Sequence, residues 1–364
     1  MRPFTYEALP GRVVFGTGSS RSQLAPEIER LGALRILLIA SARDQPLAEQ
    51  LTLPFAAAVV GHFSAVRPHV PIEVAQQARA LARELEADCL LTIGGGSAIG
   101  TAKAVALEQG QPIVAVPTTY AGSEMTPIYG LTTAQRKQTG RALAVLPRLV
   151  IYDPELTRSL PASISGPSAM NAMAHCVEAL YAPGANPITS LIAEEGIRAL
   201  AHGVPLAVAQ PENMDGRSET LYGAYLAGAA LAAAGTSLHH KICHSLGGAY
   251  NLPHAEMHTV VLPHAVAFLA PALPEAMGRI ARALGAPEQG ELAAATALYD
   301  LATTIGAPRG LKDLGLAEAQ LSEAAALVYN QLPPDLPRTI DEPAIAALLA
   351  DAFWGRRPTL DGGR

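Results

Sequence analysis

Histidines gather in one short stretch of the chain. Six of the ten lie within residues 238–264, and His175 stands alone in PSAMNAMAHCVEALY. Residues four apart share one face of a helix, which pairs His240 with His244 and Asn171 with His175. Two such helices can direct imidazoles into one cleft, where the rings could bind a metal ion or transfer protons. The predicted catalytic set contains four histidines: His175, His240, His244 and His254.

Another pair of histidines in this stretch has a different interpretation. His254 and His258 are also four apart, but the glutamate between them stands at the wrong position for the HExxH motif of zinc proteases. We therefore assign the remaining histidines of the stretch to ordinary packing: His239, His258 and His264.

A glycine-rich loop is the second candidate site. The segment DCLLTIGGGSAIGTAKAVAL places Gly94, Gly95, Gly96 and Ser97 after an apolar strand pattern and before an apolar helix pattern. Glycines let a pyrophosphate approach the backbone, and the free N–H groups of the first helical turn attract its charge. This context predicts dinucleotide binding. The upstream FGTGS, at residues 15–19, lacks a third glycine and is interpreted as a turn.

Hydroxyl-bearing residues follow the next predicted strand, in VPTTYAGSEMT at residues 116–126. The carboxyl ends of neighbouring parallel strands form the ligand-binding edge of an open α/β sheet. We expect Thr118, Thr119 and Ser123 to line the ribose and carboxamide of a cofactor, with Tyr120 reaching the substrate.

The elements that would position these residues alternate strand and helix in the first half of the chain. Apolar runs predict buried strands at residues 36–40, 89–93, 113–116 and 149–152, and residues 71–86 have the pattern of an amphipathic helix. This succession predicts a parallel sheet covered on both faces. Later stretches are rich in Ala and Leu. We expect an α/β Rossmann-like dinucleotide-binding domain over residues 1–156, an all-helical catalytic domain over residues 157–364, and an active site in the cleft between them.

The charge balance excludes several classes of partner. A formal net charge of −6 leaves no general basic face for nucleic acid or an anionic membrane surface. No segment approaches the roughly 20 apolar residues that span a bilayer, and the first residues lack the pattern of a secretory leader. Cys89, Cys176 and Cys243 are widely spaced, which fits a reducing compartment. We expect a cytoplasmic protein that binds neither nucleic acid nor membranes.

Four features follow one another along the chain: GGGS, PTT, the helix with His175, and HxxxHxLG followed by PH. With these motifs in this order, the chain resembles the iron-containing alcohol dehydrogenase superfamily over nearly its whole length. The resemblance implies the dehydroquinate synthase-like architecture, in which an aspartate and three histidines hold a divalent metal. Those ligands correspond here to Asn171, His175, His240 and His254, and His244 corresponds to an active-site histidine that is not a ligand. The neutral amide removes the one anionic ligand that offsets the cation's charge, so we expect no bound metal.

Two departures from the superfamily pattern indicate one branch of it. Gly100 replaces the aspartate of GGGSxxD, and Asn171 replaces the metal-binding aspartate; together with TTYAGSE and LHHKICH they resemble the maleylacetate reductases. The resemblance implies an oxidoreductase that uses NADH or NADPH to reduce the carbon–carbon double bond of maleylacetate. The product would be 3-oxoadipate, in bacterial catabolism of resorcinol, hydroxyquinol and chlorinated aromatic compounds. The resemblance also implies a homodimer.

That reaction makes specific demands on the site. Hydride addition to the alkene carbon remote from the ketone creates an enolate, whose oxygen needs a hydrogen-bond donor and whose carbon needs a proton. We hypothesise that His240, His254 or His175 stabilises the oxygen, and that Tyr120 or His244 supplies the proton. The two carboxylates of the substrate need polar partners. The candidates are Lys241 and Asn171, with Arg338 and Arg136 as weaker ones.

Cofactor choice is decided at the end of the second predicted strand. A carboxylate there accepts the adenosine ribose hydroxyls of NADH and repels the extra phosphate of NADPH. LLIASAR places Ser41 at that position with Arg43 nearby, which predicts tolerance of both cofactors. By the resemblance, Lys137 corresponds to a lysine near the cofactor ribose.

Two alternatives stay open. One is a metal-dependent alcohol dehydrogenase or aldehyde reductase of the same fold, with Asn171 tolerated as a ligand. The other is a nucleotide-binding protein without catalysis, against which the intact histidines and hydroxyl-rich loop argue. Metal analysis tests the first, and NADH oxidation with maleylacetate tests the second.

Overall fold

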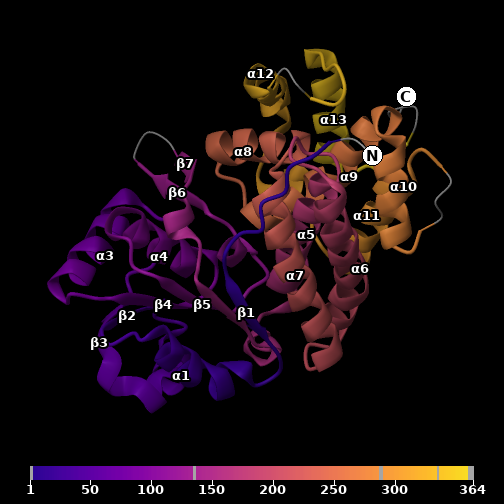
Figure 1. Cartoon of the computed structure of the whole chain (residues 1–364). Coiled ribbons are helices and arrows are strands. Elements are labelled where there is room, and N and C mark those ends of the chain that lie inside the picture. Colours follow the sequence, from indigo (N-terminus) through magenta and orange to yellow (C-terminus); the bar gives the residue numbers. More distant parts are fainter. Residues whose placement is uncertain (1–2, 134–136, 287–289, 334–335, 360–364) are drawn as a thin grey trace. The chain divides into compact units, whose positions relative to one another are not determined.

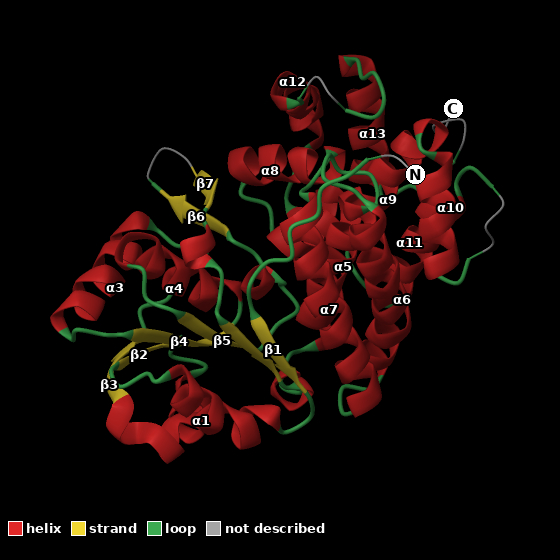
Figure 2. Cartoon of the chain, viewed as in Figure 1, coloured by secondary structure: helices red, strands yellow, loops and turns green. Residues whose placement is uncertain are grey.

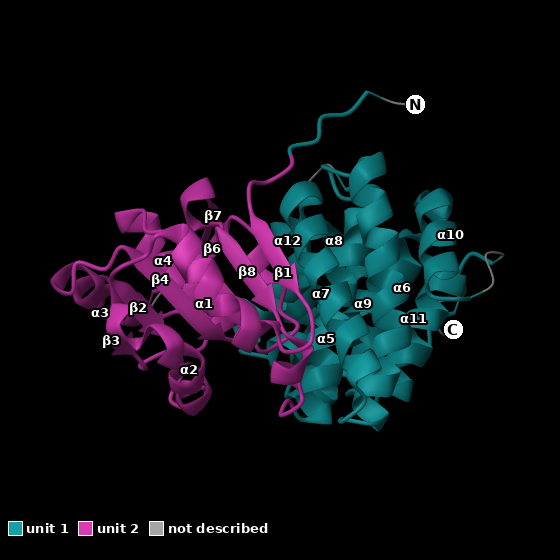
Figure 3. Cartoon of the chain, turned by 60° about the horizontal axis from the view of Figure 1, so that its bottom comes forward, with its two compact units in different colours: residues 1–7, 161–364 teal, residues 8–160 magenta. Residues whose placement is uncertain are grey.

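The computed structural model describes residues 3–133, 137–286, 290–333 and 336–359, which are drawn in Figure 1. The chain forms two compact units, coloured separately in Figure 3. One contains residues 8–160, and the other contains residues 161–364 together with the first seven residues. The division between Leu160 and Pro161 comes shortly after the change in composition noted in the sequence.

A six-stranded sheet, parallel throughout, forms the core of the unit 8–160. Its spatial order is β1-β8-β5-β4-β2-β3. Strands β2, β4, β5 and β8 are buried along their whole length, which explains their uninterrupted apolar sequences. The strands are β1 Arg12–Phe15, β2 Ile36–Ile39, β3 Val59–Phe63, β4 Cys89–Gly94, β5 Ile113–Pro117 and β8 Leu149–Tyr152.

Helices cover both faces of this sheet, as predicted. Apolar residues of α1 and α2 pack in one core cluster and those of α3 and α4 in another, with strand residues in each. A two-stranded antiparallel hairpin of β6 Ile128–Thr132 and β7 Lys137–Arg141 follows β5. The helices are α1 Ser19–Leu31, α2 Gln45–Thr52, α3 Ile72–Glu84 and α4 Gly96–Gln109.

The connections diverge between β2 and β4. The chain leaves β2 toward β3 on one side, and it leaves β4 toward β5 on the other. Such a switch point, at the carboxyl ends of adjacent strands, is where open α/β sheets bind their ligands. The glycine-rich loop follows β4 at this point.

The other unit is helical, and its described residues contain no strand (Figure 2). The prediction of an all-helical second half is confirmed. Its central helix α5 is buried along most of its length and packs against α6, α7 and α9. The helices are α5 Ala162–Ala179, α6 Pro187–Ala209, α7 Met214–Ala234, α8 Leu238–Tyr250, α9 His254–Leu269, α10 Pro274–Ala283, α11 Ala293–Thr304, α12 Leu321–Gln331 and α13 Glu342–Trp354.

All three cysteines are buried and free. Cys89 lies in β4, Cys176 in α5 and Cys243 in α8. Burial raises the pKa of Cys89 to about 12, and it raises the pKa of the other two thiols as well. The thiols thus belong to the packed interior of each unit.

Within the described ranges, no single helix has the length and apolar composition needed to cross a membrane. Helices α7 and α8 meet that test only when taken as one broken segment, and they are bent by 98° at the break.

Candidate active site

A buried carboxylate holds His240 in the helical unit. Glu178 on α5 is fully buried and accepts a hydrogen bond from His240 Nδ1 over 2.6 Å. The carboxylate also accepts from the backbone N–H groups of Ser237, over 2.9 Å, and of His240, over 3.3 Å. The His240 ring is thereby oriented, and its Nε2 has no hydrogen-bond partner in the described part of the chain. A histidine held in this way can present Nε2 to a substrate oxygen or a metal ion.

His175 stacks on His240, with ring centroids 4.9 Å apart and an interplanar angle of 22°. Nδ1 of His175 and Oδ1 of Asn171 are buried and unpartnered among the described residues. Burial, and after it the neighbouring histidines, lowers the pKa of His175 well below its usual value. Its imidazole is therefore neutral near pH 7, and this group of atoms can accept a proton, a hydrogen bond or a cation.

His239 and His258 also lie in this cluster, although the sequence assigned them to ordinary packing. Both are fully buried, and His239 Nε2 and His258 Nδ1 share a hydrogen bond of 2.9 Å. The His258 ring centroid lies 4.8 Å from that of His240 and 4.3 Å from that of His254. One nitrogen each from His239, His240 and His258 lies within 4.8 Å of the others, a grouping that could hold a metal ion. Burial lowers the pKa of His239 and of His258 well below the usual value.

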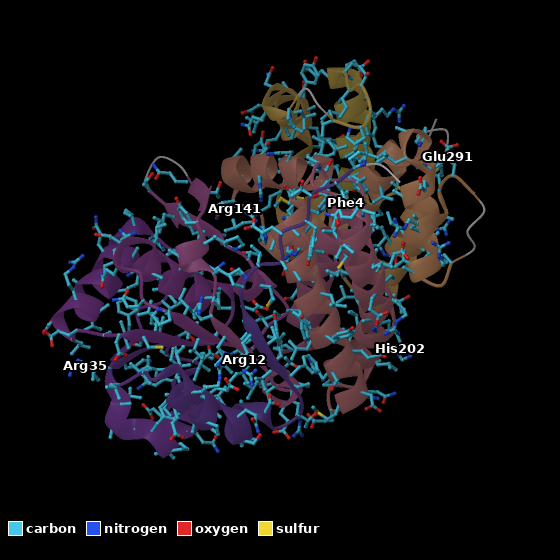
Figure 4. The ribbon with its side chains drawn as sticks, viewed as in Figure 1. Phe4, Arg12, Arg35, Arg141, His202 and Glu291 are labelled. Carbon is cyan, nitrogen blue, oxygen red and sulfur yellow. The ribbon has the colours of Figure 1, made fainter. Side chains whose placement is uncertain are left out.

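The cluster has an exposed edge, formed by His244 and His254. His244 and Lys241 are exposed on α8, and His254 is exposed as the first residue of α9. The His244 ring lies 5.8 Å from that of His240. The structure thus brings all four predicted histidines into one group. His202, labelled in Figure 4, is instead an exposed residue of α6 that pairs with Glu219.

The structure does not bring Arg338 to this cluster. Its guanidinium donates to the carbonyl oxygen of Phe268 over 2.6 Å and lies 4.5 Å from the centroid of that ring. Phe268 is at the carboxyl end of α9 and His254 is at its amino end. At a rise of about 1.5 Å per residue, roughly 20 Å separates these ends. Arg136, the other weak candidate, lies outside the described residues.

The glycine loop forms the junction between β4 and α4 in the unit 8–160. Strand β4 ends at Gly94, and α4 begins at Gly96 and continues through Ser97. Gly94 has a φ of +148°, which L residues rarely adopt, and a Cβ on Gly95 would come within 2.9 Å of Thr119 Cγ2. Gly95 caps α4 without a side chain, so the first N–H groups of the helix stay available to an anion. Free N–H groups at the start of a helix, beside a glycine turn, are an arrangement that can bind an anion.

The loop after β5 lies against the glycine loop. The backbone N–H of Thr118 donates to the carbonyl oxygen of Gly94 over 3.1 Å, and Thr119 stands beside Gly95. Tyr120, the next residue, is fully buried. Thr118 and Thr119, two of the residues predicted to line the ribose and carboxamide, therefore lie beside the glycine loop at the carboxyl edge of the sheet.

A buried lysine fixes the rest of that loop. Lys103 on α4 donates through Nζ to the carbonyl oxygens of Ser123, Thr126 and Ile128, and to the Thr126 hydroxyl, over 2.6 to 3.0 Å. Burial lowers the pKa of Lys103 to about 7, and the nearby carboxylate of Glu124 opposes this shift. Ser123 is thereby tied to the helix that follows the glycine loop. Lys137 begins β7, which pairs with β6.

A carboxylate stands beside Ser41 at the end of β2. The Ser41 hydroxyl donates to Asp44 Oδ2 over 2.7 Å, and a turn closed by Asp44 N and Ser41 O, 2.9 Å apart, brings the two residues together. Asp44 Oδ2 also lies 3.1 Å from the point that a Cβ on Gly94 would occupy. The sequence argument considered only the position of Ser41 and missed this carboxylate.

Comparisons with known proteins identify the family of the chain. The model of the iron-containing alcohol dehydrogenases matches residues 10–154, and the model of the carboxyl-terminal part of that family matches residues 167–353. The maleylacetate reductase of Sphingobium indicum is 48% identical over 355 residues, covering 98% of this chain and 99% of that protein.

Solved structures give the same result. The maleylacetate reductase of Agrobacterium tumefaciens is 43% identical with a TM-score of 0.93, and the match covers 98% of this chain and 100% of that one. An iron-containing alcohol dehydrogenase of Corynebacterium glutamicum is 45% identical with a TM-score of 0.93, over 98% of each chain. The chain therefore belongs to the iron-containing alcohol dehydrogenase family and, within it, to the group of the maleylacetate reductases.

Proposed function

We propose that this chain reduces the carbon–carbon double bond of maleylacetate with NADH or NADPH, giving 3-oxoadipate. Similarity to maleylacetate reductases at 44 to 48% identity over 98% of the chain supports the substrate. The observation that carries the mechanism is the buried contact between Glu178 and His240, which leaves Nε2 of His240 unpartnered among the described residues.

In this proposal the dinucleotide binds to the unit 8–160 at the glycine loop, Gly94–Ser97. When bound, the reduced cofactor supplies a hydride. The protein's own contribution is to hold the diphosphate at the start of α4 and to place hydroxyls of Thr118, Thr119 and Ser123 along the ribose and carboxamide. Lys137 remains a candidate for the ribose.

His240 is our candidate for stabilising the enolate oxygen. Addition of hydride to the alkene carbon remote from the ketone pushes an electron pair onto the ketone oxygen. A proton on both ring nitrogens of His240 makes an imidazolium, whose charge the buried carboxylate of Glu178 offsets. Nε2–H can then donate to the oxygen as its negative charge develops. His175, held neutral by burial, supports the ring by stacking.

The enolate carbon then takes a proton, and two groups are candidates for the donor. His244 is exposed beside His240 on α8, and Tyr120 comes from the loop after β5. His254 lies on the same exposed edge and remains a candidate for the oxygen. The reaction requires that the bound nicotinamide reach the substrate at the histidines.

The substrate carries two carboxylates, and each needs donors when it leaves water. Lys241 is one exposed cation beside His240, and the amide of Asn171 can donate through Nδ2. Arg338 lies at the far end of α9 and remains the weaker prediction.

The donor set does not fit the iron that the family name implies. The family's anionic position is the neutral Asn171, and the nearby carboxylate of Glu178 is occupied by His240 and Ser237. Three imidazoles and an amide bring no negative charge to offset a buried dication. The alternative grouping with His239 and His258 is opposed by their mutual hydrogen bond, since one of those nitrogens carries a proton. We therefore derive no step through a metal.

The test is NADH oxidation with maleylacetate, measured by loss of absorbance, with and without a chelator. We expect turnover that survives chelation, in protein whose metal content is far below one atom per chain. Stoichiometric zinc or iron, lost together with activity on chelation, would favour the second candidate, a metal-dependent alcohol dehydrogenase or aldehyde reductase. The observation that favours the metal-dependent enzyme is the grouping of His239, His240 and His258.

The wider setting follows from the substrate. We propose a role late in the bacterial catabolism of resorcinol, hydroxyquinol or chlorinated aromatic compounds, and a homodimer as the assembly. Size-exclusion chromatography with light scattering measures the oligomeric state directly.

A further inference from the structure

We propose that Lys103 is a positioning residue of the cofactor site: its ammonium group, enclosed by oxygen atoms, holds the loop after β5 in the conformation that receives the dinucleotide. The inference rests on the dinucleotide-dependent reduction proposed above and deepens it. Lys103 is 1% exposed, so it acts on the cofactor only through the residues that it holds.

The first support is the set of oxygen atoms around the ammonium group. Lys103 Nζ lies 2.6 Å from the carbonyl oxygen of Ser123, 2.7 Å from that of Thr126 and 2.8 Å from that of Ile128. The hydroxyl of Thr126 is the fourth oxygen, at 3.0 Å. An ammonium group carries three hydrogens and no lone pair, so it can donate to several of these acceptors at once. Residues 123–128 therefore fold around a cation that is covalently part of the chain.

The second support is the position of this segment relative to the glycine loop. The loop after β5 is joined to the β4–α4 segment at its beginning, where the Thr118 N–H donates to the Gly94 carbonyl oxygen over 3.1 Å. Lys103 joins the end of the loop to the same segment, because it lies on α4 about two turns after the first residue, Gly96. The hydroxyl-bearing residues between these two attachments are thereby held beside the glycine loop.

The third support is a buried carboxylate in the same segment. Glu124 is 1% exposed, and its Oε1 accepts a hydrogen bond from the Tyr152 hydroxyl on β8 over 2.7 Å. The charge of Glu124 opposes the lowering of the Lys103 pKa by burial, so it favours the ammonium form. Lys103 and Glu124 together attach the segment to α4 and to β8.

A loop held in this way has its binding conformation before the cofactor arrives. Without Lys103, the three carbonyl oxygens would lose their donor, and the segment would adopt other conformations as well. A chain whose binding-competent conformation is populated only in part binds its ligand more weakly in proportion. Loss of Lys103 should therefore weaken cofactor binding in protein that is still folded.

The experiment measures the dissociation constant of NADH by calorimetric titration of the full chain, in the absence of substrate. The variant is Lys103→Ala, which removes the cation and leaves space for a small one. The matched control is Ile28→Ala. Ile28 is buried in the core cluster that contains residues of α1 rather than α4, so this variant also lowers stability but leaves the loop untouched. Urea unfolding establishes that each variant is folded under the conditions of the titration.

We expect Lys103→Ala to bind NADH at least about tenfold more weakly than the unmodified chain, as for a loop that keeps its binding conformation about one tenth of the time. Ile28→Ala should stay within about twofold, because a destabilised chain that is still folded keeps its site. A loss that Ile28→Ala matches, or unchanged affinity in Lys103→Ala, would overturn the proposal.

Added cations test the role of the ammonium group itself. Ammonium chloride should restore much of the NADH affinity of Lys103→Ala, because free ammonium can donate to the same oxygens. Tetramethylammonium chloride at the same concentration carries the charge without N–H donors and should restore none. A loss that ammonium fails to relieve, or relieves no better than tetramethylammonium, would overturn the proposal.

A second variant decides the matter if Lys103→Ala does not fold. Thr126→Val removes one of the four oxygens and leaves Lys103 in place. The same hydroxyl accepts from the Ile128 N–H and donates to the Ser123 carbonyl oxygen, so its loss loosens the segment without removing the cation. NADH should bind several-fold more weakly to folded Thr126→Val, and unchanged affinity would overturn the proposal.

The titrations also separate this inference from the proposed function. The expected pattern of NADH binding without reduction of maleylacetate would leave the role of Lys103 standing and overturn the proposed function. An unmodified chain that binds no NADH would overturn both.

Discussion

The sharpest test of the catalytic proposal is Glu178→Gln. The change is nearly isosteric, but glutamine has one acceptor oxygen and one donor group where the carboxylate accepts at both oxygens. The oxygen can still accept from Ser237 N and His240 Nδ1, bonds of 2.9 and 2.6 Å in the unmodified chain. The amide group then faces the backbone N–H of His240, donor against donor. Glutamine brings no charge to balance a proton on both ring nitrogens of His240, so a ring that donates through Nδ1 to the amide oxygen presents a lone pair from Nε2.

The magnitude follows from the lost donor. Removing one donor to a developing oxyanion lowers kcat by roughly 10²- to 10³-fold, and we expect that loss with maleylacetate. The KM for NADH should change little, because the cofactor cradle is formed by other residues. One poorly satisfied buried donor should lower the free energy of unfolding by about 1 to 3 kcal/mol.

The assay is steady-state reduction of maleylacetate, with urea unfolding to confirm that the variant folds. Glu195→Gln is the control, because Glu195 is a partly exposed partner of Arg198 on α6. Nitrogen-15 NMR of the His240 ring reports the loss of the Nε2 proton. If Glu178 had only a structural role, this signal would stay unchanged in the variant. A folded Glu178→Gln with kcat within about threefold of the unmodified chain would refute the reasoning.

Three further predictions concern stability, measured by urea unfolding. Burial lowers the pKa of His264 to about 4, so the unfolded chain binds more protons below pH 6.5, and stability falls as the pH falls from about 6.5 toward 4. Between pH 7 and pH 5 the unmodified chain should lose about 2 kcal/mol more than His264→Leu; equal losses would contradict this. Lys103→Met should lower the free energy of unfolding by about 3 kcal/mol or more, because the carbonyl oxygens that accept hydrogen bonds from Lys103 would lose their donor. A loss under about 1 kcal/mol would contradict this prediction. Gly100→Ala should lower the free energy of unfolding by about 1 to 3 kcal/mol, because the new Cβ would lie 2.7 Å from Val70 Cγ2. The control Gly248→Ala places its Cβ in open space and should not lower the stability. Equal effects of the two substitutions would refute the packing argument.

Much of the fold could be predicted because buried parallel strands and amphipathic helices leave direct patterns. The predicted strand at residues 89–93 is β4, and the predicted helix at residues 71–86 contains α3. The turn at residues 15–19 was also predicted. There Asp153 accepts from the backbone N–H groups of Gly18 and Ser20, so the anion position at the start of α1 is filled by the protein's own carboxylate. No sequence pattern places Asp153, from the far end of the unit, at that turn.

The parts of the site that were missed depend on partners distant in sequence. Glu178 follows His175 by three residues on α5, and this spacing could have placed it on the same helix face. Its contact with His240 depends on how α5 packs, which spacing does not reveal. His239 and His258 were set aside because each alone resembles a core histidine, and only folding brings them to His240.

The buried cysteines give the chain three internal reporters of its own opening. A thiol whose pKa is raised by burial is almost entirely protonated near neutral pH, and alkylating reagents and peroxides react with thiolates. Each cysteine should therefore be labelled only during the intervals when its surroundings open. Cys89 reports on the sheet, whereas Cys176 and Cys243 report on the helices that carry the histidines. Labelling rates at the three positions would show whether the two units open together or separately.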